Sequence, residues 1–112
     1  MHAPDLPDAM TIEVRDELGP LVTMLLLHIA LYGPSLRADA VRLARAEHAG
    51  MVVCGHSHVP FIGRDKGITV MNPGSIGPRR FHLPIVFGVM DVRRAGISMH
   101  HVSCETGARW EP

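Results

Sequence analysis

Two histidines spaced one residue apart, His56 and His58, are the residues of this chain best suited to chemistry. They follow an apolar run at residues 52–54 that stops at Gly55. Such a run is typical of a buried strand, and a glycine at its end permits a tight turn of the backbone. Side chains two residues apart on extended chain project to the same side, and neutral imidazole is the commonest metal ligand. The pair is therefore a candidate metal site, with two loop histidines bonded to backbone or water as the alternative.

A third histidine has an equivalent position earlier in the chain. His28 follows a nearly continuous apolar run at residues 21–27. Strand 21–27, helix 35–49 and strand 51–54 together make a β-α-β unit, whose two strands should be parallel. Because ligands of open α/β sheets gather where parallel strands end, we expect His28 to lie close to His56.

The helix at 35–49 is predicted from its two ends and from one apolar stripe. Ser35 suits the N-cap position, and Gly50 suits the residue that ends a helix. Arginines elsewhere on this segment alternate with acidic residues, which is typical of a solvated face, so we assign them no function. The apolar stripe has the helical spacing i, i+4, i+7 and i+8 and consists of Leu36, Ala40, Leu43 and Ala44.

The rest of the chain alternates polar and apolar residues between turn signals, which predicts antiparallel hairpins. The turn Asn-Pro-Gly-Ser at 72–75 should be of type II, with proline at i+1 and glycine at positive φ. The predicted fold class is therefore α/β, with one β-α-β unit followed by antiparallel hairpins, in a single domain 1–112 with a tail at 103–112. The hairpin strands are expected at 11–14 with 21–27, at 61–64 with 68–71, and at 85–92 with 97–102.

Composition narrows the partners and the cellular location. Eleven basic and eleven acidic side chains cancel, so no net charge favours nucleic acid or an anionic membrane. The apolar run at 21–27 is far shorter than the roughly 20 residues of a membrane span. Cys54 and Cys104 fit free thiols in a reducing compartment. Arg79 and Arg80 could clamp a phosphate, but surface charge is the favoured interpretation. We expect a soluble, cytoplasmic protein with no membrane partner and no specific nucleic-acid surface.

The order of these motifs resembles the C-terminal half of the calcineurin-like metallophosphoesterases, and in particular their small bacterial and archaeal phosphodiesterase branch. The resemblance is carried by His28 after a strand, by Gly-His-Ser-His at 55–58 and by Asn-Pro-Gly-Ser at 72–75. It extends over residues 5–92. It implies part of a metallophosphoesterase sandwich.

The resemblance also implies a centre of two divalent metals. His28 and His56 match ligands of one metal, and His58 matches a ligand of the other. The implied metal is Mn²⁺ first, with Ni²⁺, Zn²⁺ or Fe as alternatives. The implied reaction is hydrolysis of a phosphate ester substrate, a monoester or diester, by metal-activated water.

The sequence departs from the family pattern. The Asp-x-His, Gly-Asp and Gly-Asn motifs that supply carboxylate ligands have no match in residues 1–112, and Ile29-Ala30 stands where the family has Gly-His. Two divalent ions ~3.5–4 Å apart need anionic bridging ligands, and histidine supplies no charge. We therefore expect this chain alone to be a weak or inactive phosphoesterase, with an N-terminal half of the domain or a second copy as partner. The acidic residues near the start do not follow buried strands and are not expected to substitute; they are Asp5, Asp8, Asp16 and Glu17.

Two other functions stay open from the sequence. One is a non-catalytic protein-interaction module built on the same scaffold. The other is a structural zinc held by Cys54, His56 and His58, which leaves the fourth ligand of a tetrahedral site unidentified.

Overall fold

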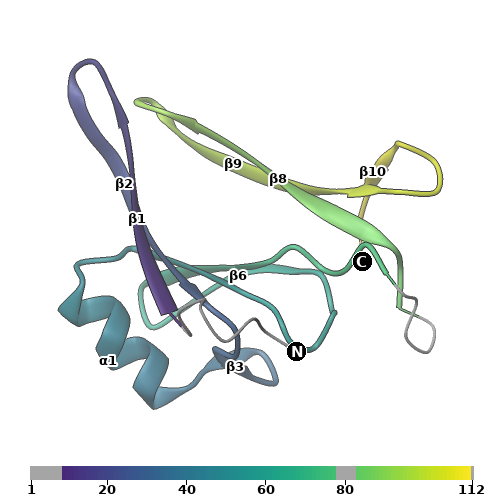
Figure 1. Ribbon diagram of the computed structural model, residues 1–112, viewed down its shortest axis with the longest axis horizontal. Helices are drawn as coiled ribbons and strands as arrows, with labels where there is room; N and C mark the ends of the chain where they lie inside the picture. Colours follow the sequence, from purple (N-terminus) through teal and green to yellow (C-terminus); the bar gives the residue numbers. More distant parts are fainter. Residues whose placement is uncertain (1–8, 78–82, 112) are drawn as a thin grey trace.

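The computed structural model describes residues 9–77 and 83–111, and this part of the chain forms three main layers (Figure 1). A helix covers one face of a five-stranded sheet, and a three-stranded sheet covers the other face. The leading segment with Asp5 and Asp8, and the pair Arg79 and Arg80, lie outside the described residues.

The five-stranded sheet has the strand order β1-β2-β5-β7-β6. Strands β2, β5 and β7 run parallel in its middle, while β1 and β6 pair antiparallel at its edges. This confirms the predicted β-α-β unit and the first two hairpins, whereas the parallel pairing of β5 with β7 was not predicted. The strands are β1 (Ala9–Asp16), β2 (Gly19–Leu27), β5 (Met51–Cys54), β6 (Phe61–Asp65) and β7 (Ile68–Asn72).

The helix α1 (Ala38–Ala46) is shorter than predicted, and the bounds 35–49 are wrong at both ends. Before it, β3 (Leu31–Tyr32) and β4 (Ser35–Leu36) pair as a two-stranded ribbon, so Ser35 lies in a strand and is not the N-cap. The helix of the described part of the chain has neither the length nor the apolar character to cross a membrane.

The helix α1 begins three residues later than predicted, and the residues before it form hydrogen bonds outside the helix. The backbone N–H of Leu36 donates to the Asp65 carboxylate at 2.8 Å, and the N–H of Arg37 donates to the Ala30 carbonyl at 2.8 Å. These two bonds, together with the pairing of β4 with β3, fix residues 35–37 in extended conformation outside the helix.

The C-terminal end of α1 is closed by hydrogen bonds centred on His48. The N–H of Ala49 donates to the Ala44 carbonyl at 2.8 Å, and the N–H of His48 donates to the Arg45 carbonyl at 3.2 Å. His48 has a φ of 55°, the left-handed conformation that this kind of helix end requires. Gly50, the predicted helix terminator, comes two residues too late for this role.

Replacing His48 with glycine should raise the free energy of unfolding by about 0.5–1 kcal/mol, because glycine adopts a positive φ without the steric cost that other residues bear. The His48 side chain is exposed, so little packing is lost with it. Urea denaturation measures the difference. The His48→Ala variant keeps the backbone strain and should stay within about 0.5 kcal/mol of the wild type. Equal effects of the two substitutions would show that His48 is not strained.

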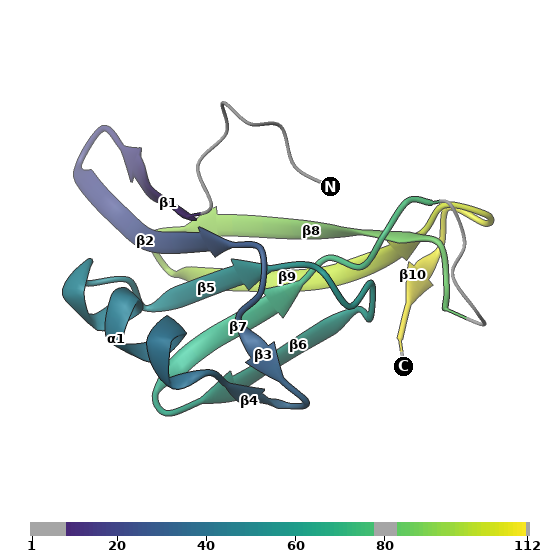
Figure 2. The same cartoon turned by 60° about the horizontal axis from the view of Figure 1, so that its bottom comes forward.

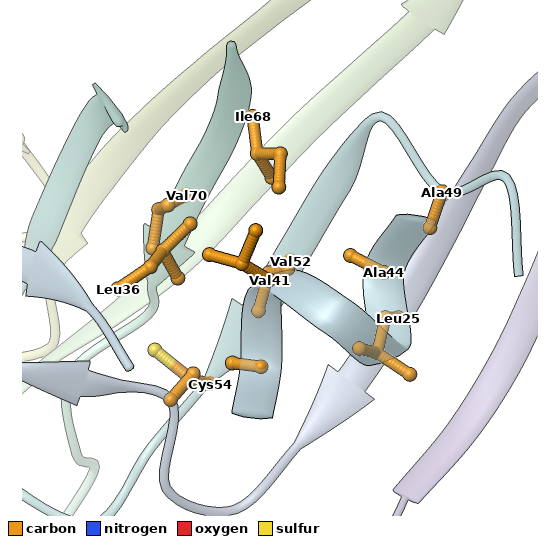
Figure 3. Packing of buried hydrophobic residues seen from close by; sticks show 11 residues of the cluster. Leu25, Leu36, Val41, Ala44, Ala49, Val52, Cys54, Ile68 and Val70 are labelled. Atoms are coloured by element: carbon orange, nitrogen blue, oxygen red, sulfur yellow. The ribbon is translucent and has the colours of Figure 1, made fainter. Parts of the chain in front are cut away.

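The hydrophobic core lies between α1 and the five-stranded sheet (Figure 3). Neighbouring strands contribute the fully buried side chains of Leu25, Val52 and Val70. On the helix, Val41 is buried and Leu43, expected in the buried stripe, is only half-buried. Since Leu36 precedes the helix, the buried face of α1 is rotated from the predicted stripe. That face consists of Ala40, Val41 and Ala44.

The third layer is the predicted third hairpin, which packs against the opposite side of the sheet from α1 (Figures 1 and 2). It consists of β8 (Val86–Arg93) and β9 (Gly96–Ser103). At Gly88 an added Cβ would lie 3.0 Å from Pro73 Cβ and 3.2 Å from Pro73 Cα, so β8 approaches the residue after β7 closely at this position. Strand β10 (Arg109–Trp110) pairs with β9, so the tail docks on this layer.

Candidate metal centre

The three parallel strands end at the same edge of the sheet, and the predicted site residues follow two of these ends (Figure 2). Leu27 at the end of β2 lies opposite Cys54 at the end of β5. The pairing continues one residue further, because the Gly55 N–H donates to the His28 carbonyl at 3.0 Å. Strand β7 ends beside them at Asn72. The three motifs of the sequence therefore meet at one place.

His28 and His56 come together at this edge. The Nε2 atom of His28 lies 3.3 Å from the Nδ1 atom of His56, and the ring centroids are 5.1 Å apart at an interplanar angle of 76°. The predicted proximity of the two rings is confirmed. Two nitrogen ligands of a tetrahedral zinc, each about 2.0–2.1 Å from the ion, are about 3.3 Å apart. The two nitrogens therefore have the separation needed to share one ion where a hydrogen bond now joins them.

The loop after β5 turns through the histidines themselves. His56 has a φ of 72° and His58 a φ of 64°. The left-handed conformation costs a residue other than glycine about 1–2 kcal/mol. Gly55, which was expected to make the turn, does not take a positive φ, and a Cβ there would meet only the His28 carbonyl at 3.9 Å. Backbone strain of this kind clusters at functional sites.

His58 is half-buried and is not grouped with His28 and His56, which are called the histidine pair below. Its Nδ1 atom is buried with no hydrogen-bond partner in the part of the chain that the structure describes. A buried polar atom without a partner is costly, so a partner for this nitrogen is to be expected. Within residues 9–77 and 83–111, no three His, Cys, Asp or Glu side chains are grouped closely enough to hold one metal ion. The described residues therefore contain one pair of imidazole nitrogens at ligand spacing, His28 and His56, and no complete metal site.

Cys54 belongs to the buried hydrophobic cluster under α1 (Figure 3). Burial raises the pKa of its thiol to about 11, because a thiolate is disfavoured among apolar side chains. Among the described residues, no three His, Cys, Asp or Glu side chains are grouped closely enough to hold a metal ion, so the structure gives no support to a structural zinc held by Cys54, His56 and His58.

Asn72 joins the two sequence motifs through its side chain. Its Nδ2 atom donates to the Gly55 carbonyl at 3.3 Å and to the Ser57 hydroxyl at 3.2 Å, and its Oδ1 atom accepts from the Gly74 N–H at 2.9 Å. Only 1% of Asn72 is exposed. Gly74 has a φ of 82°, as the predicted type II turn requires. Asn72 therefore fixes the loop that carries His56.

His101 in turn holds the backbone of Asn72. Its Nε2 atom lies 2.7 Å from the Asn72 carbonyl, and its ring meets the Trp110 ring edge-on at 5.9 Å between centroids. Sequence reasoning assigned no role to Asn72 beyond the turn, and none to His101 beyond being a poor chelate with its neighbour. An asparagine directly after a buried strand was the available signal, because its amide must find partners when it is buried.

Asp16 is engaged at the far end of the molecule, as expected for a residue in a hairpin turn. It pairs with Arg94 in the turn between β8 and β9, with 3.1 Å between Oδ2 and Nε, and this pair joins the tips of two layers (Figure 1). The Arg94 guanidinium lowers the pKa of the Asp16 carboxyl. Asp16 is thus not a ligand of the histidine pair.

Two of the three parallel strands are followed by histidines, and a helix covers one face of their sheet. The chain is therefore an α/β protein with a candidate metal centre at the carboxyl edge of its sheet. The sequence profile of the calcineurin-like phosphoesterase superfamily domain matches residues 2–95. The chain therefore belongs to the calcineurin-like phosphoesterase superfamily. Among curated proteins, no significant match is found.

Several solved structures share this fold. Wild-type Vps29 from Entamoeba histolytica in complex with Zn²⁺ has a TM-score of 0.68 and 15% identity, over 97% of this chain and 61% of that chain. A predicted phosphoesterase from Streptococcus pneumoniae has a TM-score of 0.70 and 18% identity, with coverages of 99% and 64%. Vps29 from Chaetomium thermophilum has a TM-score of 0.71 and 17% identity, over 98% of this chain and 59% of that chain. The chain thus has a partial metallophosphoesterase-like fold that spans 59–64% of the length of these relatives.

Proposed function

We propose that this protein is a metal-dependent phosphoesterase whose metal centre takes His28 and His56 as ligands of one divalent ion and His58 as a ligand of a second. Its substrate is a phosphate monoester or diester. The observation that carries the proposal is the 3.3 Å separation of the two imidazole nitrogens at the ends of parallel strands, in a chain of the phosphoesterase superfamily. The unpartnered Nδ1 atom of His58 supports the second ligand role.

The residues of this chain position the reaction. His28 and His56 hold their ring nitrogens at ligand spacing, and Asn72 keeps the loop of His56 in place through Gly55 and Ser57. Divalent ions in such a centre neutralise charge on phosphoryl oxygens and activate water. Imidazole alone suits Zn²⁺, Ni²⁺ or Fe, and Mn²⁺ becomes the proposed ion once carboxylates complete the site.

The centre also needs negative charge, because imidazoles do not offset the repulsion between two divalent ions. In the described residues no carboxylate completes a group of three with the histidine pair. The proposal therefore includes carboxylates from elsewhere, either from an N-terminal half of the domain or from a second copy of the chain. Residues 1–112 alone should then hydrolyse little substrate.

The cytoplasmic location stays a prediction that rests on the two free cysteines.

Calorimetric titration of residues 1–112 with Zn²⁺ and Mn²⁺ tests the ligand assignment. We expect the wild type to bind one ion, and His28→Ala or His56→Ala to lower the affinity about tenfold or more. His48→Ala is the matched control, because His48 is an exposed imidazole, as His28 and His56 are, and lies at the end of α1 outside the histidine pair. Unchanged binding in His28→Ala and His56→Ala would move the site elsewhere.

Hydrolysis of bis(4-nitrophenyl) phosphate tests the incomplete centre. Residues 1–112 with Mn²⁺ should show little turnover, and joining them to the N-terminal half of the Streptococcus pneumoniae relative should restore part of it. Two tight metal sites with robust hydrolysis by residues 1–112 alone would contradict the need for outside carboxylates. A folded chain that binds no metal would instead favour the non-catalytic interaction module.

A further inference from the structure

A cavity opens beside the histidine pair, and the metal chemistry does not use it. It has a volume of about 340 Å³ and lies between the segments 29–34 and 55–61. This volume is at the lower end of the range for small-molecule pockets. His56 lines the cavity and also contacts His28. The cavity and the proposed metal centre therefore share a wall.

The walls of this cavity are mostly apolar. Its larger side chains are Ile29, Leu31, Val59 and Phe61, and its polar side chains are His56 and Ser57. No Lys, Arg, Asp or Glu belongs to its lining among the described residues. A nucleoside or sugar placed here would find only the side chains of His56 and Ser57 as partners for its several hydroxyl and ring nitrogen groups, and an unpaired polar group is costly when it leaves water. An apolar group carries no such cost.

We infer that the cavity binds the organic group of the ester, so that the preferred substrates are phosphate esters of aryl or branched alkyl groups rather than nucleotides or sugar phosphates. The inference rests on the proposed function, because it takes the phosphate to bind at His28 and His56. With the phosphorus at that pair, the shared wall at His56 directs the organic group towards Ile29 and Val59.

Binding of two phosphonates to residues 1–112, followed by amide chemical shifts at fixed Zn²⁺, tests this selectivity. Phenylphosphonate should bind about tenfold or more tightly than methylphosphonate, since the two share the same anionic head and differ in the apolar group. The Ile29→Ser, Val59→Ser double variant should bring the ratio of affinities close to one. Ile62→Ser is the matched control, because Ile62 is 40% exposed against 37% for Ile29 and lies outside this cavity.

Equal affinities for the two phosphonates in the wild type, or a ratio that the double variant leaves unchanged, would overturn the inference. Binding of adenosine 5′-monophosphate as tight as that of phenylphosphonate would also overturn it. Benzyl alcohol tests binding in the cavity independently of the phosphate site, because it has the aryl group and no phosphorus. If it shifts the amide signals of 29–34 and 55–61 while neither phosphonate binds, the cavity selects aryl groups and the proposed function is wrong. If both phosphonates bind equally and benzyl alcohol has no effect, the proposed function stands and the inference fails.

Discussion

The Asn72→Ala variant is expected to lose about 2–4 kcal/mol of unfolding free energy, because it removes the partners of three groups around a buried side chain. The Asn72 amide donates to the Gly55 carbonyl and the Ser57 hydroxyl and accepts from the Gly74 N–H. Asn72 is 1% exposed, so water cannot fully replace these bonds. Urea denaturation followed by circular dichroism gives the difference in free energy.

The same variant should also weaken metal binding, although Asn72 is not a ligand. Groups that orient a metal-binding loop typically contribute about 10–100-fold in metal affinity. The Asn72→Asp variant tests the donor function of the amide, since a carboxylate still accepts from the Gly74 N–H and no longer donates to Gly55 and Ser57. It should lose at least as much stability as Asn72→Ala, because it places a carboxylate in a site that is 1% exposed and beside the Gly55 carbonyl. It should lose as much zinc affinity as Asn72→Ala. Ser98→Ala on the exposed face of β9 is the control for a polar side chain without these contacts, and it should change neither quantity. A loss under about 0.5 kcal/mol with unchanged zinc affinity would contradict the positioning role.

The parts of the fold that were predicted correctly depend on contacts close in sequence. The hairpins β1–β2, β6–β7 and β8–β9 follow from alternating or continuous apolar runs on either side of short turns. The parallel pairing of β2 with β5 follows from the single helix between them. The start of α1 could not be predicted, because the Leu36 N–H is held by Asp65, which lies 29 residues away in sequence. Hydrogen bonds of this range leave no signal in helix propensity or capping patterns.

The candidate site, like the fold, could be predicted from the sequence only in part. The meeting of His28 and His56 was predictable, because both follow apolar runs that had to end at one edge of a parallel sheet. The support of their loop was not. Asn72 reaches Ser57 across 15 residues and Gly55 across 17, and His101 reaches Asn72 across 29. These bonds depend on how β7 and β9 pack against the strand ends, which no local pattern specifies.

His56→Ala and His56→Gly are expected to lose metal binding alike, by about tenfold or more, and to differ in stability. At φ 72°, alanine retains the steric cost of the left-handed conformation and glycine does not. Glycine gives back part of this gain through the entropy of the unfolded chain, so His56→Gly should be more stable than His56→Ala by about 0.5–1 kcal/mol. The His56 side chain is exposed, so both variants lose little packing.

The same pair of substitutions at His28 provides the internal control, because His28 is not among the described residues with positive φ. There the order should reverse, with His28→Gly less stable than His28→Ala by about 0.5–1 kcal/mol, since glycine only adds freedom to the unfolded chain. Metal titration and urea denaturation of the four variants therefore separate ligand chemistry from backbone strain. If His56→Gly retained zinc affinity, His56 would not be a ligand. If the order of stabilities were the same at both positions, the left-handed conformation of His56 would not store strain, and its imidazole would be held in place without a cost to folding.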